Sequence, residues 1–167
     1  MNEKSLRVLE FNKIIDKLKT KASSSLGLKH IENLKPSNDF DEVKNTLLET
    51  SEAQAILIKR GLVSMDGIHD IEDKAKRAHV GATLDPGALL KIADCLRVAR
   101  SLKRNLEGSE EEDFNYPIIQ ALTNALYTFR DIEDRIYTSI VGESEISDNA
   151  STTLKTIRRR IVQKNQS

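Results

Sequence analysis

Residues 84–106 read LDPGALLKIADCLRVARSLKRNL and contain the clearest helix start in the chain. Asp85 suits an N-cap, because its carboxylate can accept hydrogen bonds from first-turn amides, and Pro86 suits the first helical position, where no amide is needed. Apolar side chains then recur at helical spacing along one stripe, which consists of Leu89, Ile92, Leu96, Ala99 and Leu106. The stretch predicts one long helix whose stripe, including Leu96, lies in a core.

The rest of the chain predicts more helices of the same kind. Aromatic residues make up 4% of the 167 residues, tryptophan is absent and proline occurs three times, which is typical of helices packed by aliphatic side chains. Apolar spacing and cap residues place the other helices at about 5–22, 24–34, 39–60, 71–78, 117–140 and 148–161. Asp39 is the expected N-cap of the helix over 39–60, with Glu42, three residues on, completing a capping box. We therefore expect an all-α bundle of about six to eight helices. It should form a single domain over residues 1–167, with the last helix leading out of its body.

The stretch from Ile118 to Ile140 repeats its apolar residues in alternating steps of four and three, the spacing of a seam against another helix. Packing inside the core is the favoured interpretation, because fewer than four heptads are present. A protein-interaction adaptor that uses this seam stays open as an alternative.

Membrane and secreted proteins do not fit this sequence. The longest apolar run, residues 55–58, is far too short to span a bilayer, and charged residues interrupt the N-terminus where a signal peptide needs apolar ones. The one cysteine, Cys95, excludes an internal disulfide and favours a reducing compartment. We expect a cytoplasmic protein with no membrane partner.

Catalytic and metal sites have no recognisable signature in the sequence. No Gly-x-x-x-x-Gly-Lys-Ser/Thr motif occurs, so we expect no ATP binding by these residues. The candidates for a soft metal site are His69, His79 and Cys95 with Asp70 or Asp94, but their spacing fits no known ligand pattern. We expect no metal ion here.

Two polar clusters also have structural interpretations. Ser23–Ser25 are better interpreted as helix caps than as nucleophiles, because no histidine is placed by sequence to activate them. The acidic run Glu110–Asp113 lacks the spacing and glycine of a calcium-binding loop, and is interpreted as solvated. We therefore expect no catalytic residue, no cofactor and no enzyme activity in these 167 residues.

Charge is the one property that indicates a function. The 26 basic and 26 acidic residues are sorted into blocks, and residues 150–167 carry five basic residues and no acidic one. Basic helix faces can neutralise phosphates without reading a nucleotide sequence. The candidate nucleic-acid contacts are Arg97, Arg100, Arg104, Arg158, Arg159 and Arg160. The alternative, which stays open, is that these are solvated faces neutralised by acidic blocks of the same fold.

Three segments resemble the MutS-II family, a branch of the MutS-like ATPases. They are MNEKSLRVLEFNKIIDKL (residues 1–18), GIHDIEDKAKRAHVGATLDPGALLKIADCLRVARSLKRNL (67–106) and EISDNASTTLKTIRRRI (145–161). The unit from Ser24 through Pro36 to Asp39 is similar to the start of the family's lever region. One departure is Ser144, which stands where the family usually has glycine.

The resemblance implies a non-catalytic core and lever fragment from the N-terminal part of a larger protein. Whole members bind ATP and Mg in a P-loop domain, dimerise, and often carry an Smr endonuclease module. They act on branched DNA or collided ribosomes, in suppression of homologous recombination and in ribosome rescue. The clamp, ATPase and Smr regions would lie outside these residues, and the partners would be the rest of the parent chain, DNA or the ribosome. A self-sufficient nucleic-acid- or ribosome-binding module is the alternative.

Overall fold

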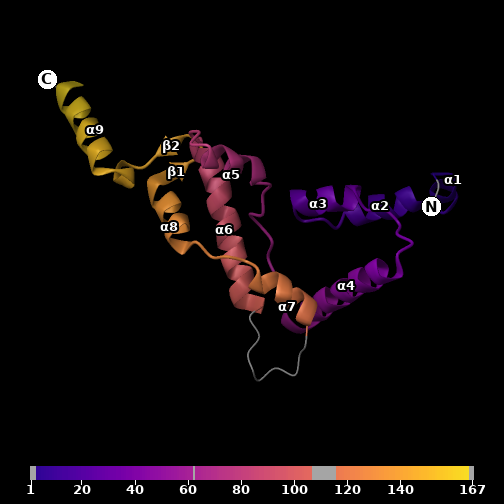
Figure 1. Ribbon diagram of the computed structural model, residues 1–167. Helices are drawn as coiled ribbons and strands as arrows, with labels where there is room; N and C mark the ends of the chain where they lie inside the picture. Colours follow the sequence, from indigo (N-terminus) through magenta and orange to yellow (C-terminus); the bar gives the residue numbers. More distant parts are fainter. Residues whose placement is uncertain (1–2, 62, 107–115, 166–167) are drawn as a thin grey trace. The chain divides into compact units, whose positions relative to one another are not determined.

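The computed structural model describes residues 3–61, 63–106 and 116–165 (Figure 1). Within these ranges the chain forms nine α-helices, one short 3-10 helix and one two-stranded antiparallel sheet. The predicted all-α class is confirmed. None of the helices in the described part of the chain is both long and apolar enough to cross a bilayer.

The chain divides into two compact units. The first comprises Met1–Ile68 and Ser101–Tyr127, and the second comprises His69–Arg100 and Thr128–Ser167. The division falls inside helix α6 (Pro86–Leu106), which contributes residues to both units. The single-domain interpretation of residues 1–167 is not tested by this division and stays a prediction.

The first unit begins with three short helices, α1 (Glu3–Val8), α2 (Phe11–Lys19) and α3 (Ser25–Glu32). The prediction of one helix over residues 5–22 is wrong, because Glu10 adopts a left-handed conformation with φ of 53°. A left-handed residue cannot continue a right-handed helix, so the chain turns between α1 and α2. This break is one reason why the helix count exceeds the expected six to eight.

Helices α3 and α4 (Phe40–Arg60) start at the predicted caps. Ser24 Oγ accepts from the amide of Gly27 at 3.0 Å, and Asp39 Oδ1 accepts from the amide of Glu42 at 3.0 Å. The Glu42 carboxylate accepts from the Ser37 hydroxyl instead of closing the predicted capping box. Helix α4 ends at Gly61, whose φ of 79° suits a residue without a β-carbon.

The core of the first unit gathers where α4, the end of α6 and α7 (Pro117–Asn124) meet. Its buried members are Ile56, Leu106 and Tyr116. Glu52 on α4 caps α7 from a distance, since its Oε2 accepts from the amides of Ile118 and Ile119, each at 2.9 Å. An acid at a helix N-terminus is favourable, because it satisfies amides that have no partner within the helix.

The second unit contains α5 (Glu72–His79), most of α6, α8 (Arg130–Ser139), the strands β1 (Ile140–Gly142) and β2 (Glu145–Ile146), the 3-10 helix η1 (Asp148–Ala150) and α9 (Thr152–Asn165). The start of α6 is as predicted, with Asp85 Oδ1 accepting from the amide of Ala88 at 2.7 Å. Ala93, Ile136 and Ile140 form the buried cluster in which α6 meets α8 and β1.

The predicted helix over residues 117–140 is wrong. Helix α7 ends at Asn124 and α8 begins at Arg130, and the last residue of the expected seam, Ile140, is in strand β1. Lys103 Nζ donates to the carbonyl of Leu126, in the segment that follows α7, at 2.9 Å. The hairpin β1–β2 was not predicted, because three-residue and two-residue strands are too short to show an alternating pattern.

The buried face of α6 differs from the predicted stripe. Ala93 and Val98 are the least exposed of its side chains, at 0% and 2%, while Leu96 is only half-buried. Leu106 alone of the predicted stripe is fully buried, and Leu89, Ile92 and Ala99 are half-buried. In the second unit α6 contacts α8 and β1 through Ala93 and contacts His69 through Cys95, so burial does not follow the single-face pattern that the spacing of large apolar residues indicates.

The different burial of Val98 and Leu96 predicts that an aspartate at these two positions destabilises the fold to different extents. Val98→Asp should lower the free energy of unfolding by about 3 kcal/mol or more, because it buries a charge without a partner. Leu96→Asp should cost less, since Leu96 keeps part of its surface in water. Urea denaturation followed by circular dichroism measures both. Lys91→Asp, on the exposed side of the same helix, is the control. A larger loss for Leu96→Asp than for Val98→Asp would contradict the burial described here.

Candidate nucleic-acid interface

The six candidate arginines lie on two helices. Arg97, Arg100 and Arg104 are on α6, with the first two in the second unit and Arg104 in the first. The other three, Arg158, Arg159 and Arg160, are on α9 in the second unit. Their surroundings differ so much that the six residues do not form one class.

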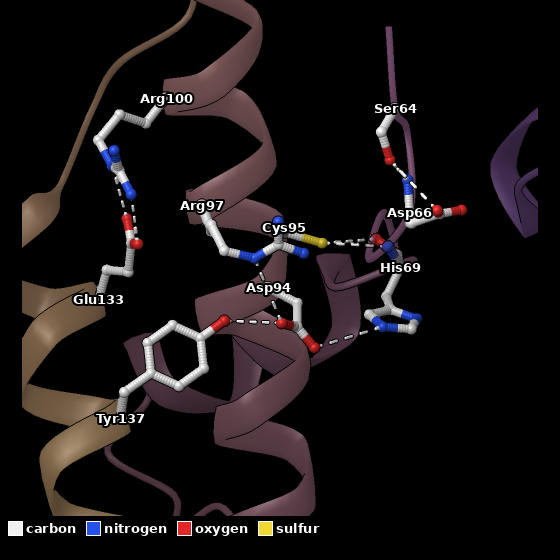
Figure 2. Close-up of polar contacts among 9 residues, drawn as sticks. All are labelled: Ser64, Asp66, His69, Asp94, Cys95, Arg97, Arg100, Glu133 and Tyr137. Carbon is white, nitrogen blue, oxygen red and sulfur yellow. Dashed lines mark hydrogen bonds and ion pairs between the residues drawn. The ribbon is translucent and has the colours of Figure 1, made fainter. Parts of the chain in front are cut away.

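Arg100 forms a bidentate ion pair with Glu133 of α8 (Figure 2). Its Nη2 donates to Glu133 Oε1 at 2.7 Å and its Nε donates to Oε2 at 3.0 Å. The Glu133 side chain is only 6% exposed and that of Arg100 is 31% exposed. The guanidinium of Arg100 is therefore engaged in holding a buried carboxylate.

The ion pair shifts the pKa values of both side chains so that their charged forms are favoured. The hydrogen bond from Arg100 lowers the pKa of Glu133, against the opposing effect of burial, and the charges of Arg100, Arg130 and Arg97 lower it further. The same hydrogen bond raises the pKa of Arg100. Glu133 therefore stays ionised at neutral pH although it is buried, and α6 and α8 are joined at this point.

Arg97 lies next to a second acid, Asp94. Its Nε is 3.8 Å from Asp94 Oδ1, and the same oxygen accepts from the Tyr137 hydroxyl of α8 at 2.6 Å (Figure 2). Burial, and then the hydrogen bond to Asp94, raises the pKa of Tyr137. Arg97 is nevertheless exposed, so part of its guanidinium faces water.

The candidate metal ligands come partly together. His69 Nε2 lies 4.0 Å from Asp94 Oδ2, and the Cys95 thiol accepts from the backbone amide of His69 at 3.1 Å (Figure 2). Among the residues that the structure describes, no three His, Cys, Asp or Glu side chains are grouped so that they could hold a metal ion. The acidic run Glu110–Asp113 lies outside the described residues.

The arginines of α9 divide into one with structural partners and two that are exposed. Arg158 Nη1 donates to the Ile146 carbonyl at 3.0 Å and forms an ion pair with Asp148 of η1. Arg159 and Arg160 are exposed, as is Arg104 on α6. Exposed guanidinium groups can pair bidentately with phosphate oxygens, so these three are the arginines best placed to contact a nucleic acid.

The comparisons with known proteins fit the predicted resemblance. No protein-family model matches the chain. A protein from Clostridioides difficile named Endonuclease MutS2 is 71% identical over all 167 residues. The chain is a homologue of the MutS2 endonucleases. The resemblance to the MutS-II family is thereby confirmed.

Two further MutS2 endonucleases are similar to almost the whole length of the chain. The protein from Alkaliphilus oremlandii is 47% identical over 165 residues, 99% of the chain, and that from Acetivibrio thermocellus is 50% identical over 161 residues, 96% of the chain. These matches cover 20–21% of the relatives' own length. The chain therefore spans about a fifth of the length of the curated relatives it matches.

Sequence reasoning named the arginines but missed their partners. Glu133 follows Ile132 in a stretch interpreted as an apolar seam, and nothing local connects it with Arg100, 33 positions earlier. Asp148 was predicted at the start of the last helix, where it could equally have served as a cap. The only sequence signal for the buried ion pair is that Glu133 lies next to an apolar stripe, and this signal is weak.

The Arg100–Glu133 pair predicts how stability depends on pH. Because the pKa of Glu133 is lowered in the folded state, its charge stabilises the fold fully above the ordinary carboxyl pKa of 4.5. That stabilisation is lost as the pH falls through the lowered pKa. Glu133→Gln should lower the free energy of unfolding at pH 7 by about 1–3 kcal/mol, towards the lower end because Arg100 is partly exposed.

Urea denaturation at a series of pH values from 7 downwards measures this effect. The difference between the original chain and Glu133→Gln should shrink as the pH falls below 4.5, because the carboxyl group becomes neutral first in the unfolded state and, below its lowered pKa, in the folded state as well. Asp134→Asn is the matched control, since Asp134 is exposed on the same helix and its ion pair with Arg130 is at the surface. Equal losses for the two substitutions at pH 7 would refute the role of the buried pair.

Proposed function

We propose that these residues are the non-catalytic core and lever segment of a MutS2-type ATPase. The observation that carries the proposal is the 71% identity to Endonuclease MutS2 over the whole chain, combined with a coverage of only 21% of that protein. The chain matches that relative over its whole length and lacks a phosphate-loop motif. These two properties favour a segment that transmits motion over a segment that binds and hydrolyses ATP.

The packing of the second unit supports a lever mechanism. A lever moves as a rigid body only if its helices resist bending and sliding, which requires a close-packed interior. Ala93 and Val98 are almost completely buried on α6, and the bidentate Arg100–Glu133 pair fixes the register of α6 against α8. A directional ion pair adds resistance to sliding that apolar contacts alone do not provide.

The proposal extends to the whole protein. ATP and Mg would bind in a P-loop domain elsewhere in that protein, which would act as a homodimer in the cytoplasm. Its targets would be branched DNA or collided ribosomes, and its biological effects suppression of homologous recombination and ribosome rescue. Any endonuclease activity, the one that the relatives' name states, would reside outside these 167 residues.

A hybrid protein tests the lever role. This chain replaces the matching 167 residues of the Clostridioides difficile Endonuclease MutS2, and ATP-dependent binding to a four-way DNA junction and to ribosomes is measured. The hybrid should retain the effect of ATP on binding. The same hybrid with Val98→Asp should still bind ATP but lose that effect, because a softened lever cannot transmit the change.

The hybrid with Lys91→Asp serves as the control for added negative charge on α6. Full coupling between ATP and target binding in the Val98→Asp hybrid, despite a measured loss of stability in this segment, would exclude the lever role. Loss of coupling in both substituted hybrids would indicate an effect of charge and would equally contradict the proposal.

The second candidate function is nucleic-acid or ribosome binding by this segment itself, through its basic helix faces. The observation that favours it is the charge of α9, which carries five basic residues and no acidic one within Thr152–Asn165, with Arg159 and Arg160 exposed. Such a helix attracts phosphates by Coulomb interaction, and the attraction weakens with salt.

Titration of the chain with labelled duplex DNA, a four-way junction and an RNA hairpin tests this second function. If the chain contacts two phosphates, raising the salt concentration from roughly 50 to 200 mM should weaken binding about tenfold, because bound counterions are released on association. Fluorescence anisotropy measures the affinities. Absence of binding to all three probes at the lower salt concentration would leave only the lever role.

A further inference from the structure

Arg158 has two partners in the segment that precedes α9. Its Nη1 donates to the Ile146 carbonyl at the end of strand β2, 3.0 Å away, and forms an ion pair with Asp148 of η1. These partners lie twelve and ten residues earlier in the chain. Arg158 therefore ties the second turn of α9 back to the connection from which the helix emerges.

That connection is itself attached to α8. The Ser147 amide donates to the Ser139 carbonyl at 2.8 Å, and the Ser147 hydroxyl accepts from the amide of Asn149 at 3.1 Å. The Ser151 hydroxyl then caps α9 by accepting from the Leu154 amide at 3.0 Å. A series of short contacts therefore runs from α8 through η1 to Arg158, and it determines the direction in which α9 leaves the hairpin.

The two arginines that follow point elsewhere. Successive residues of an α-helix are rotated by about 100°, so a helix that turns Arg158 towards the hairpin turns Arg159 and Arg160 away from it. Both are exposed. Lys155 is not grouped with them, because its Nζ donates to Asn149 Oδ1 of η1 at 3.4 Å. Acidic residues are absent from α9, so none of its own residues neutralises these charges.

We infer that the three consecutive arginines have two different tasks: Arg158 is a positioning residue that sets the direction of α9, and Arg159 and Arg160 contact the phosphate backbone of a nucleic acid. This inference rests on the second proposed function. Charge complementarity identifies the partner, since a duplex presents a negative charge about every 1.7 Å along its axis. The guanidinium fork matches two phosphate oxygens at once.

Three variants of equal charge change separate the two tasks. Arg158→Gln, Arg159→Gln and Arg160→Gln each remove one positive charge from α9, and Lys91→Gln removes one from the exposed side of α6 as a control. Affinity for a labelled DNA duplex is measured over a series of salt concentrations. Arg159→Gln and Arg160→Gln should each reduce the slope of log affinity against log salt by about 0.9, because each removes one phosphate contact. Arg158→Gln and Lys91→Gln should leave the slope unchanged.

Amide hydrogen exchange of residues 147–150, measured without nucleic acid, reports on the positioning task. Arg158→Gln should accelerate this exchange about five- to tenfold, because local opening becomes easier when the tie is lost, while Arg159→Gln and Arg160→Gln should not. Arg158→Lys, which keeps the charge, should accelerate it as well, since the shorter lysine side chain does not carry its ammonium group as far as Nη1 of Arg158 reaches.

Each outcome either supports or overturns the inference. A slope that falls as much for Arg158→Gln as for Arg159→Gln, or exchange that stays unchanged in Arg158→Gln, overturns the division of tasks. Equal competition by polyglutamate of the same charge overturns a nucleic acid as the partner. Absence of duplex binding by the original chain overturns the second proposed function, whereas binding that persists unchanged in Arg159→Gln and Arg160→Gln overturns only the inference.

Discussion

A carboxylate that is removed from water must be matched by a cation at hydrogen-bonding distance, and in this protein Arg100 meets that requirement for Glu133. The match favours one register of α6 against α8, because Nε and Nη2 of Arg100 must each reach one oxygen of the carboxylate. The neighbouring hydrogen bond from Tyr137 to Asp94 uses the same two helices. The apolar cluster of Ala93, Ile136 and Ile140 is buried between the same two helices and β1.

This arrangement gives the arginines of the chain different roles. Arg100 holds the buried carboxylate of Glu133, Arg158 holds the base of α9, and Arg159 and Arg160 present their charge to the solvent. A net charge of zero therefore hides a division between cations that stabilise the fold and cations that a polyanion can reach. The same division would suit the proposed lever segment, in which the interior has to be stiff.

The sequence predicted the parts of this fold that depend on neighbouring residues. The caps at Ser24, Asp39 and Asp85 were correctly placed, because each acts on an amide two or three residues further along the chain. The breaks at Glu10 and between Asn124 and Arg130 were missed, since the apolar spacing continues across them. The candidate site shows the same limit. The arginines could be named from sequence, but their partners lie ten or more positions away and only the fold identifies them.

The contact between Glu52 and α7 has a consequence for the order of folding. Helix α7 has eight residues and no side-chain cap of its own, and its cap comes from a carboxylate 66 positions earlier. A helix of this length is marginal in water on its own. We therefore expect α7 to form after a long chain loop has closed, whereas α4 can begin from its local cap.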